Sequence, residues 1–319
     1  MKKPFAIIVT GATASGKSFF ALELAKRISG EIINADIGSF YKPLTIGTAK
    51  PDWKNEEISH HLFDILDRPV DYSAVQFRCD VQSLCELIWQ RKNIPVIVGG
   101  SLFYLKSLFY GLASYEQKTV DDNTAVFEQM SNKQLWEMLQ IIDSERASRI
   151  CLQDRYRLLR ALTIFKKTGK KPSFFQPYFD PFFSFIIIDC TPNDRTVLYA
   201  KINRRVEEMF FNGWLKEVES LKGSEWESFL LRKRIIGYDD LFYALCEELR
   251  SVDRDRLVAL IQQKTRNYAK RQITFLKKLK KDITKDLSCQ NKIGGKIEQI
   301  DLTLCDVGLY ISQLLFNFK

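Results

Sequence analysis

Apolar and polar residues follow two distinct patterns along the first part of the chain. Short apolar runs at 5–9, 31–34, 94–98 and 185–188 are rich in β-branched residues, which is typical of buried strands. After the first run, apolar residues recur at helical spacing from about 18 to 28. Strands that alternate with helices predict an α/β fold, in which a parallel sheet is covered by helices on both faces.

The pattern changes after the third run. Strand signals disappear there, and apolar residues recur at helical spacing, for example from Leu135 to Ile142. We therefore predict an all-helical domain at 112–183, inserted into a discontinuous core that is formed by 1–111 and 184–282.

Beyond the fourth run the pattern predicts a helical carboxyl-terminal region, with helices at about 194–211, 214–222, 239–250 and 254–281. The tail at 283–319 has no clear pattern, and we assign it no role. No segment is long and apolar enough to cross a bilayer, so no association with a membrane is expected.

Composition agrees with a globular protein, since 45% of the residues are hydrophobic and 27% are charged. Lys and Arg number 48 against 39 Asp and Glu, and the resulting charge of +9 attracts polyanions such as nucleic acid or nucleotides. An inert basic surface is the alternative. The seven cysteines form no C-x-x-C pair, and His60 and His61 are the only histidines, which argues against a zinc site. Scattered thiols indicate a reducing cytoplasm.

A phosphate-binding pattern follows the first predicted strand and opens the first predicted helix. The glycines let backbone N–H groups turn toward a diphosphate, and the helix N-terminus favours an anion. Lys17 adds a positive charge, and the Ser18 hydroxyl suits Mg²⁺. The pattern predicts a P-loop NTPase-like sheet and a bound phosphate chain, whether of ATP or of another molecule; a plain glycine turn is the alternative. The eight residues that match G-x-x-x-x-G-K-[ST] are Gly11, Ala12, Thr13, Ala14, Ser15, Gly16, Lys17 and Ser18.

Two polar residues follow the second and third strands, at the sheet edge where the phosphate loop also lies. Asp36 is placed to accept a proton or a hydrogen bond from a nucleophile. Its alternatives are a helix N-cap or an ion pair with a nearby lysine. Ser101 follows Gly99-Gly100 and is placed to bond a leaving oxygen, with a helix cap as its alternative.

The last predicted helix is strongly basic. Its apolar residues recur near helical spacing, so one face can pack while the others stay charged, which suits an RNA backbone. A solvated surface is the alternative, although a like-charged run this dense repels itself. Arg155, Arg157 and Arg160 form a second cluster, whose alternative is surface pairing with acids. Between 264 and 281 there are eight basic residues and no acidic one: Lys264, Arg266, Lys270, Arg271, Lys277, Lys278, Lys280 and Lys281.

From residue 7 to about 279 the sequence resembles one family, the tRNA dimethylallyltransferases, which are also called tRNA isopentenyltransferases. The resemblance depends on a series of motifs in order, and the series is far more specific than a phosphate loop alone. After the phosphate loop these are Ile46-Gly47-Thr48-Ala49-Lys50-Pro51, His60-His61-Leu62-Phe63-Asp64-Ile65, Tyr72-Ser73-Ala74, Val98-Gly99-Gly100, Arg157-Leu158-Leu159-Arg160, Ile236-Gly237-Tyr238 and Lys270-Arg271-Gln272.

The resemblance implies a reaction and a set of catalytic residues. A dimethylallyl group would pass from dimethylallyl diphosphate to the exocyclic amine of the tRNA adenine immediately 3′ of the anticodon, releasing pyrophosphate. Lys17 and Arg205 would neutralise the pyrophosphate, with Mg²⁺ assisting near Ser18. Asp36 would face the amine, and Ser101 stands where the family usually has threonine.

The resemblance also implies how tRNA is bound. The helical insertion would grip the anticodon stem-loop, and the chain would act as a monomer. Ile37 and Ser39 replace polar residues of the family, which affects base selectivity more than catalysis. The residues that match the family's tRNA-binding elements are Asp36, Ile37, Gly38, Ser39, Tyr156, Arg157, Leu158, Leu159, Arg160, Arg234, Gly237, Tyr238, Lys270, Arg271 and Gln272.

Two rival functions remain open at this point. A small-molecule kinase would use the same loop to transfer a phosphoryl group from ATP, but it leaves the basic helix unexplained. A non-catalytic RNA-binding protein would bind tRNA without forming a product.

Overall fold

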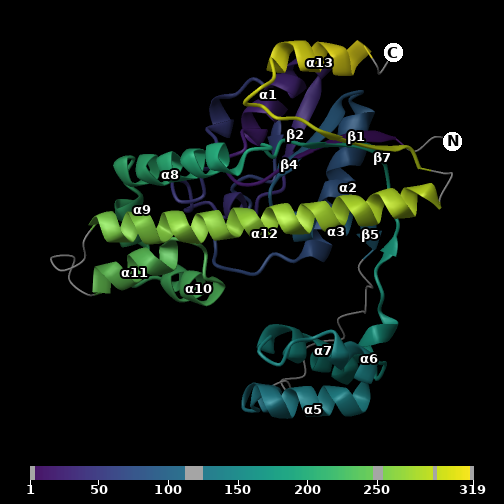
Figure 1. Cartoon of the computed structure of the whole chain (residues 1–319), viewed down its shortest axis with the longest axis vertical. Helices are drawn as coiled ribbons and strands as arrows, with labels where there is room; N and C mark the ends of the chain where they lie inside the picture. The colour runs from purple at the N-terminus through teal and green to yellow at the C-terminus, as the bar shows by residue number, and fades with distance from the viewer. Residues whose placement is uncertain (1–3, 112–124, 247–253, 290–292, 317–319) are drawn as a thin grey trace. The chain divides into compact units, whose positions relative to one another are not determined.

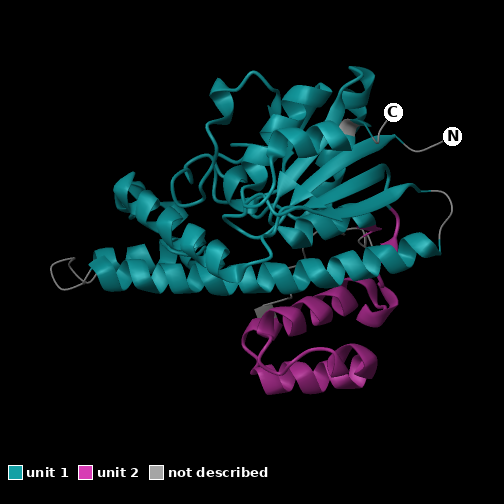
Figure 2. Cartoon of the chain, turned by 45° about the horizontal axis from the view of Figure 1, so that its top comes forward, with its two compact units in different colours: residues 1–109, 181–319 teal, residues 110–180 magenta. Residues whose placement is uncertain are grey.

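The chain forms two compact units in the computed structural model, which describes residues 4–111, 125–246, 254–289 and 293–316. The first unit contains residues 1–109 and 181–319, and the second contains residues 110–180 (Figure 2). No helix in the described parts of the chain is long and apolar enough to span a membrane.

A six-stranded parallel sheet forms the centre of the first unit (Figure 1). All four strands expected from the apolar runs are confirmed, and two short strands at the edges are additional. In spatial order the strands are β3 (His60–His61), β2 (Gly30–Asn34), β4 (Ile94–Gly99), β1 (Phe5–Thr10), β7 (Ser184–Asp189) and β8 (Gly295–Gln299).

Helices cover both faces of this sheet, as predicted. Alternate residues of β1, such as Ile7 and Val9, pack on one face with α1 (Lys17–Ile28) and α13 (Val307–Phe316). The other face meets α2 (Ala74–Gln90) and α3 (Leu102–Phe109), where the ring of Phe109 contacts Phe185 of β7. Two 3₁₀ turns, η1 (Ile37–Phe40) and η2 (Trp53–Asn55), lie between β2 and β3.

The helices after β7 pack around a second apolar core of the same unit, which includes Trp214, Tyr238 and Ile261. The short helix α10 was not predicted, and residues 247–250 of the third predicted helix lie outside the described residues. The observed helices are α8 (Arg195–Phe211), α9 (Trp214–Leu221), α10 (Glu225–Lys233), α11 (Tyr238–Cys246) and α12 (Arg254–Ser288).

The region from residue 282 onward has more structure than its sequence indicated. Helix α12 continues seven residues past its predicted end at 281, because buried Ile283 extends the apolar stripe of Leu276 and Leu279. Strand β8 then pairs with β7, and Ile311 and Leu314 of α13 pack against the core beside α1. The stretch that we left without a role therefore completes one edge and one face of the sheet.

The second unit is helical, as predicted for this stretch. Its core is formed by residues such as Leu135, Leu139 and Leu158. A two-residue antiparallel pair between β5 (Tyr110–Gly111) and β6 (Tyr178–Phe179) brings the two ends of the unit together. Its helices are α4 (Ala125–Glu128), α5 (Asn132–Ile142), α6 (Ser144–Ser148) and α7 (Arg155–Thr168), followed by the 3₁₀ turn η4 (Pro172–Phe174).

Candidate active site

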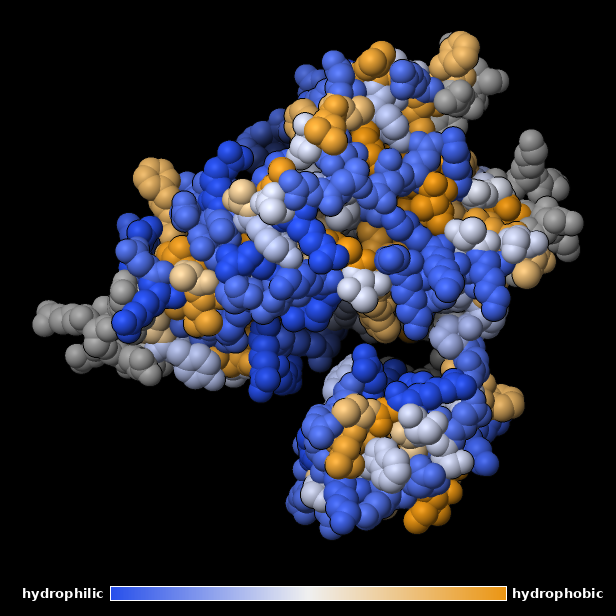
Figure 3. Space-filling model, viewed as in Figure 1, coloured by the Kyte–Doolittle hydropathy of each residue, from blue (hydrophilic) through white to orange (hydrophobic). Residues whose placement is uncertain are grey.

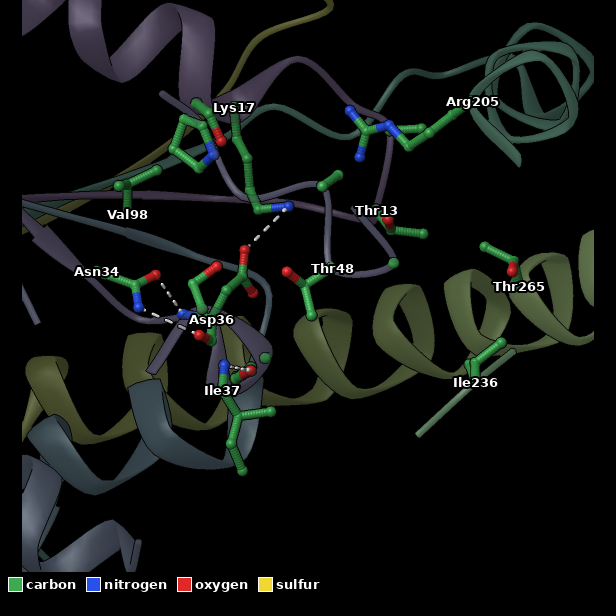
Figure 4. Close-up of a pocket in the computed structure, with 18 of the residues that line it drawn as sticks. Thr13, Lys17, Asn34, Asp36, Ile37, Thr48, Val98, Arg205, Ile236 and Thr265 are labelled. Carbon is green, nitrogen blue, oxygen red and sulfur yellow. Dashed lines mark hydrogen bonds and ion pairs between the residues drawn. The ribbon is translucent and has the colours of Figure 1, made fainter. Parts of the chain in front are cut away.

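A cavity of about 720 Å³ opens in the first unit, at the edge of the sheet where β1, β2 and β4 end (Figure 4). This is where an open parallel sheet normally binds its ligand, because the turns after neighbouring strands meet there. Its lining comes from the phosphate loop, η1, the stretch after residue 46, and the facing sides of α8 and α12.

The phosphate loop bends sharply between β1 and α1. Ala14 and Gly16 adopt positive φ angles of 63° and 92°, and Gly16 precedes α1 without a side-chain cap in the described chain. The first-turn N–H groups of α1 are therefore left for an anion. The Ser15 hydroxyl is buried and finds no partner among the described residues, which fits a loop built to enclose a polar ligand.

Three charged side chains from separate elements converge on the cavity. Lys17 of α1, with only 7% of its surface exposed, places Nζ 3.6 Å from Oδ2 of Asp36. Arg205 reaches the same space from α8 (Figure 4). Burial lowers the pKa of Arg205, while the negative charge of Asp36 opposes that shift. These three side chains bring two cations and one anion together, and Arg234 and Arg271 add further positive charge to the lining.

Asp36 is held in place from both sides. The backbone N–H of Gly100 donates to Oδ1 at 2.5 Å, and the backbone N–H of Asp36 donates to Asn34 Oδ1 at 2.9 Å. Asp36 does occupy the N-cap position of η1, but its carboxylate makes no capping bond there, so capping does not explain the side chain. The ion-pair alternative is confirmed, and its partner Lys17 is the lysine of the phosphate loop.

Two hydroxyls beside Asp36 are also defined. Ser101 Oγ accepts a hydrogen bond from the Ile37 N–H at 2.9 Å, and its proton remains to be donated into the cavity. Tyr268 of α12 also lines the cavity. Burial and then the charge of Asp36 raise the pKa of Tyr268 to about 12, so the phenol keeps its proton.

Gln272 of α12 lies inside the first unit, with 5% of its surface exposed. Its Oε1 accepts from the Thr13 N–H at 2.8 Å, and its Nε2 donates to the Gly100 carbonyl at 2.9 Å. A Cβ at Gly100 would lie 2.6 Å from Nε2, so glycine is needed for the amide to fit. Although the resemblance associates Gln272 with tRNA, its amide here joins the phosphate loop to the turn that holds Asp36.

The other expected tRNA contacts of this unit lie partly in the cavity lining and partly outside it. Ile37, Gly38 and Ser39 line it, although Ser39 is buried. Lys270 and Arg271 are exposed on α12, and each cation lies 5.9 Å from a tyrosine ring.

Near the end of α10, three more of the expected residues behave differently from one another. Arg234 ends α10 in the left-handed region and lines the cavity. Gly237 has a φ of 87°, and a Cβ there would collide with Trp214 at 2.1 Å. Tyr238 is fully buried, so it supports this wall from within.

The expected tRNA contacts on α7 belong to the second unit and divide by burial. Leu158 is in the core and Leu159 packs against it. Tyr156 is 78% exposed, and Arg160 is exposed. Arg157 pairs with Asp154 at 2.6 Å, as the surface-pairing alternative predicted.

Arg155, which the sequence grouped with these arginines, has a structural role instead. Its guanidinium donates to the carbonyls of Met130 and Glu128 and thereby ties α7 to the turn between α4 and α5.

Three residues that support the site carry no recognisable sequence signal. Thr191, after β7, accepts from the Ala12 N–H at 3.3 Å. Trp214 and Glu217 of α9 contact two separate glycine motifs. The amphipathic spacing of α9 predicted a helix but not these contacts. Each contact joins positions far apart in the chain, so no local pattern relates them.

A parallel sheet with a strand–loop–helix cradle, a buried lysine and a second cation defines a P-loop protein, a class in which this loop commonly binds phosphate groups. Comparison with known proteins gives the family: the model described as IPP transferase matches residues 39–279. The chain belongs to the IPP transferase family.

Relatives of known name agree over most of their length. The chain is 36% identical to tRNA dimethylallyltransferase 1 of Citrifermentans bemidjiense over 281 residues, which cover 87% of this chain and 90% of that protein. It is 34% identical to tRNA dimethylallyltransferase of Staphylococcus carnosus over 285 residues, covering 86% and 89%.

Solved structures share the fold. A eukaryotic dimethylallyltransferase, crystallised in snapshots of its action on tRNA, has a TM-score of 0.79 and 26% identity, with 99% of this chain and 80% of that chain covered. The tRNA delta(2)-isopentenylpyrophosphate transferase of Staphylococcus epidermidis has a TM-score of 0.61 and 27% identity, with 99% of each chain covered.

Proposed function

We propose that this protein is a prenyltransferase that modifies tRNA. It transfers a dimethylallyl group from dimethylallyl diphosphate to the exocyclic amine of the adenine immediately 3′ of the anticodon, and it releases pyrophosphate. The observation that carries this proposal is the meeting of Lys17, Arg205 and Asp36 in one cavity. The proposal agrees with the names of the relatives.

The phosphate loop and its two cations suit the leaving group. The C–O bond to the diphosphate breaks in this reaction, so negative charge grows on the diphosphate as it leaves. Preorganised positive groups that face this charge stabilise the transition state more than the ground state, and they thereby lower the barrier. Lys17 and Arg205, with the first-turn N–H groups of α1, supply that field.

Mg²⁺ is the cofactor that this donor set fits. Mg²⁺ is commonly held by one or two protein oxygens together with substrate phosphates and water. Exposed Ser18, at the first turn of α1 and in the cavity lining, offers one hydroxyl oxygen. The described residues form no cluster of three or more acidic, His or Cys ligands. The diphosphate and water would therefore supply the other ligands of the Mg²⁺ ion. Mg²⁺ would neutralise part of the pyrophosphate charge.

Asp36 suits the nucleophile. An adenine amine is a poor nucleophile because its lone pair is delocalised into the ring, and the allylic carbon compensates by bearing positive charge as its bond to oxygen breaks. A new N–C bond then forms, and the amine gives up one proton. Asp36 Oδ1 is anchored by Gly100, while Oδ2 faces the cavity, where it can orient the amine and accept that proton.

RNA would approach along α12. The face of this helix that is visible in Figure 3 is mainly hydrophilic. The exposed lysines of the helix include Lys270, Lys277, Lys278 and Lys281. Arg271 connects this face to the cavity, because it is exposed and also lines the opening. Phosphates would pair with the lysines, and the target base would be splayed out of the anticodon loop into the cavity.

The second unit would contribute further RNA contacts through α7, where Tyr156, Arg157 and Arg160 are exposed. An aromatic ring and guanidinium groups on one helix suit a single-stranded loop, since bases stack on such side chains. We further propose that the enzyme acts as a monomer in the cytoplasm, where its tRNA substrate is found.

One experiment separates this proposal from its rivals. The protein is incubated with an RNA anticodon stem-loop, Mg²⁺ and either dimethylallyl diphosphate or ATP, and the RNA is examined by mass spectrometry. A prenylated adenine with the diphosphate alone supports the proposal. Consumption of ATP with a small acceptor would indicate a kinase, and RNA that binds but stays unchanged would indicate a non-catalytic binder.

A further inference from the structure

Glu217 of α9 holds the backbone of residues 45–47, which lies far from it in the sequence. Its Oε2 accepts from the N–H groups of Thr45 and Ile46 at 2.9 and 2.6 Å. Its Oε1 accepts from the Gly47 N–H at 3.2 Å and from the Tyr238 hydroxyl at 2.6 Å. One carboxylate therefore collects three successive backbone donors and a phenol.

The same helix explains why two glycines occur in separate motifs. A Cβ at Gly47 would lie 2.0 Å from the Trp214 ring, and a Cβ at Gly237 would lie 2.1 Å from it. Both loops are therefore packed against α9 without room for a side chain. Burial, and then the Glu217 charge, raise the pKa of Tyr238 well above its ordinary value, so its hydroxyl remains a donor.

The end of the held stretch and the two residues that follow it form part of the cavity wall. Gly47, Thr48 and Ala49 line it. Thr48 and Asp36 both line the cavity (Figure 4), and a Cβ at Gly38 would be 2.7 Å from the Thr48 methyl group. Beyond this wall, Lys50 donates to the Tyr41 carbonyl at 2.8 Å, which fixes the other end of the stretch.

We propose that Glu217 is a positioning residue for the transfer reaction: it fixes residues 45–47, and through them the wall that confines the target base next to Asp36. This inference rests on the proposed function. Glu217 contacts neither Lys17 nor Arg205 in the structure, so diphosphate binding should be independent of it.

A carboxylate suits this position better than an amide. All four neighbours of Glu217 donate, and a carboxylate offers acceptors on both oxygens. In Glu217→Gln one oxygen still accepts two N–H groups, while the NH₂ group faces the Gly47 N–H. In Glu217→Met all four bonds are lost with little change in side-chain length.

The test measures turnover, pyrophosphate binding and hydrogen exchange for these two variants, with Glu219→Gln as the control. Glu219 is exposed on the same helix, so its substitution should change nothing. We expect kcat to fall roughly tenfold to a hundredfold in Glu217→Met, as for a small displacement of a reacting group, and by less in Glu217→Gln. The affinity for pyrophosphate should stay within about twofold of the wild-type value, and the binding stoichiometry should be unchanged, since the phosphate loop is intact.

Hydrogen exchange at 45–47 should accelerate in Glu217→Met and not in Glu219→Gln. Unchanged exchange, or turnover equal to that of the control, overturns the inference. A loss of kcat matched by an equal loss of pyrophosphate-binding stoichiometry also overturns it, because it means general unfolding. If the wild-type protein forms no prenylated RNA, the proposed function is refuted. Faster exchange at 45–47 in Glu217→Met would in that case still show that Glu217 holds this backbone.

Discussion

The substitution Gln272→Met tests whether α12 organises the phosphate loop. Methionine has a similar length and no hydrogen-bonding amide, so it should fill the same space without bonding Thr13 or Gly100. The Thr13 N–H and the Gly100 carbonyl then lose the partners that lie 2.8 and 2.9 Å away in the wild type.

The magnitude follows from the burial of these two groups. A buried backbone group that loses its partner costs about 1–3 kcal/mol. The Gly100 carbonyl is buried but keeps the Leu102 N–H as a second donor at 3.0 Å, whereas the Thr13 N–H is only partly buried and lies at the cavity, where water can replace its bond. We therefore expect the free energy of unfolding to fall by about 1–2 kcal/mol. At about 2–4 °C per kcal/mol for a domain of this size class, the Tm should fall by about 2–8 °C.

Thermal unfolding and pyrophosphate titration measure the two consequences. Pyrophosphate affinity should weaken by roughly fivefold to tenfold, the equivalent of about one hydrogen bond, because the loop loses its brace at Thr13. Gln263→Met is the matched control, since Gln263 is exposed on the same helix and, within the described parts of the chain, its side chain bonds only Asn267 and Arg266 of that helix. A Gln272→Met protein that melts and binds pyrophosphate like this control would refute the reasoning.

Three further predictions concern catalysis, RNA binding and pH. Asp36→Asn should slow product formation by roughly 10²–10⁴-fold while RNA affinity is retained, as measured by single-turnover assay and by RNA titration; unaltered turnover would remove the catalytic role of Asp36. Lys270→Ala or Arg271→Ala should weaken RNA binding and lower the slope of its salt dependence by about 1, and an unchanged slope would return α12 to a solvated surface. The Arg91 hydrogen bond, opposed by burial, lowers the pKa of Glu31 from 4.5 to about 2. This carboxylate therefore stabilises the fold above pH 4.5, and the contribution disappears as the pH falls from 4.5 toward 2; urea titrations at several pH values should show this loss, and Glu31→Gln should flatten it.

The amino-acid sequence alone determined the elements whose signals are local. The four apolar runs form strands because neighbouring β-branched residues favour extended backbone. The phosphate loop forms because glycines and a lysine occur at fixed short spacing before a helix. Asp36 was predicted to lie near the loop on topology alone, since parallel strands place their carboxyl ends at one edge. The 3.6 Å separation of Lys17 and Asp36 agrees with that reasoning.

Contacts between distant positions required the tertiary structure. Gln272 bonds Thr13 across 259 positions, and Glu217 bonds Ile46 across 171, so no spacing pattern could relate them. Strand β8 was missed because its alternation is weak and its pairing with β7 supplies the order. Local propensity specifies which segments become strands and helices, but only packing decides which distant side chain satisfies a buried backbone group, because that depends on where the whole chain brings it.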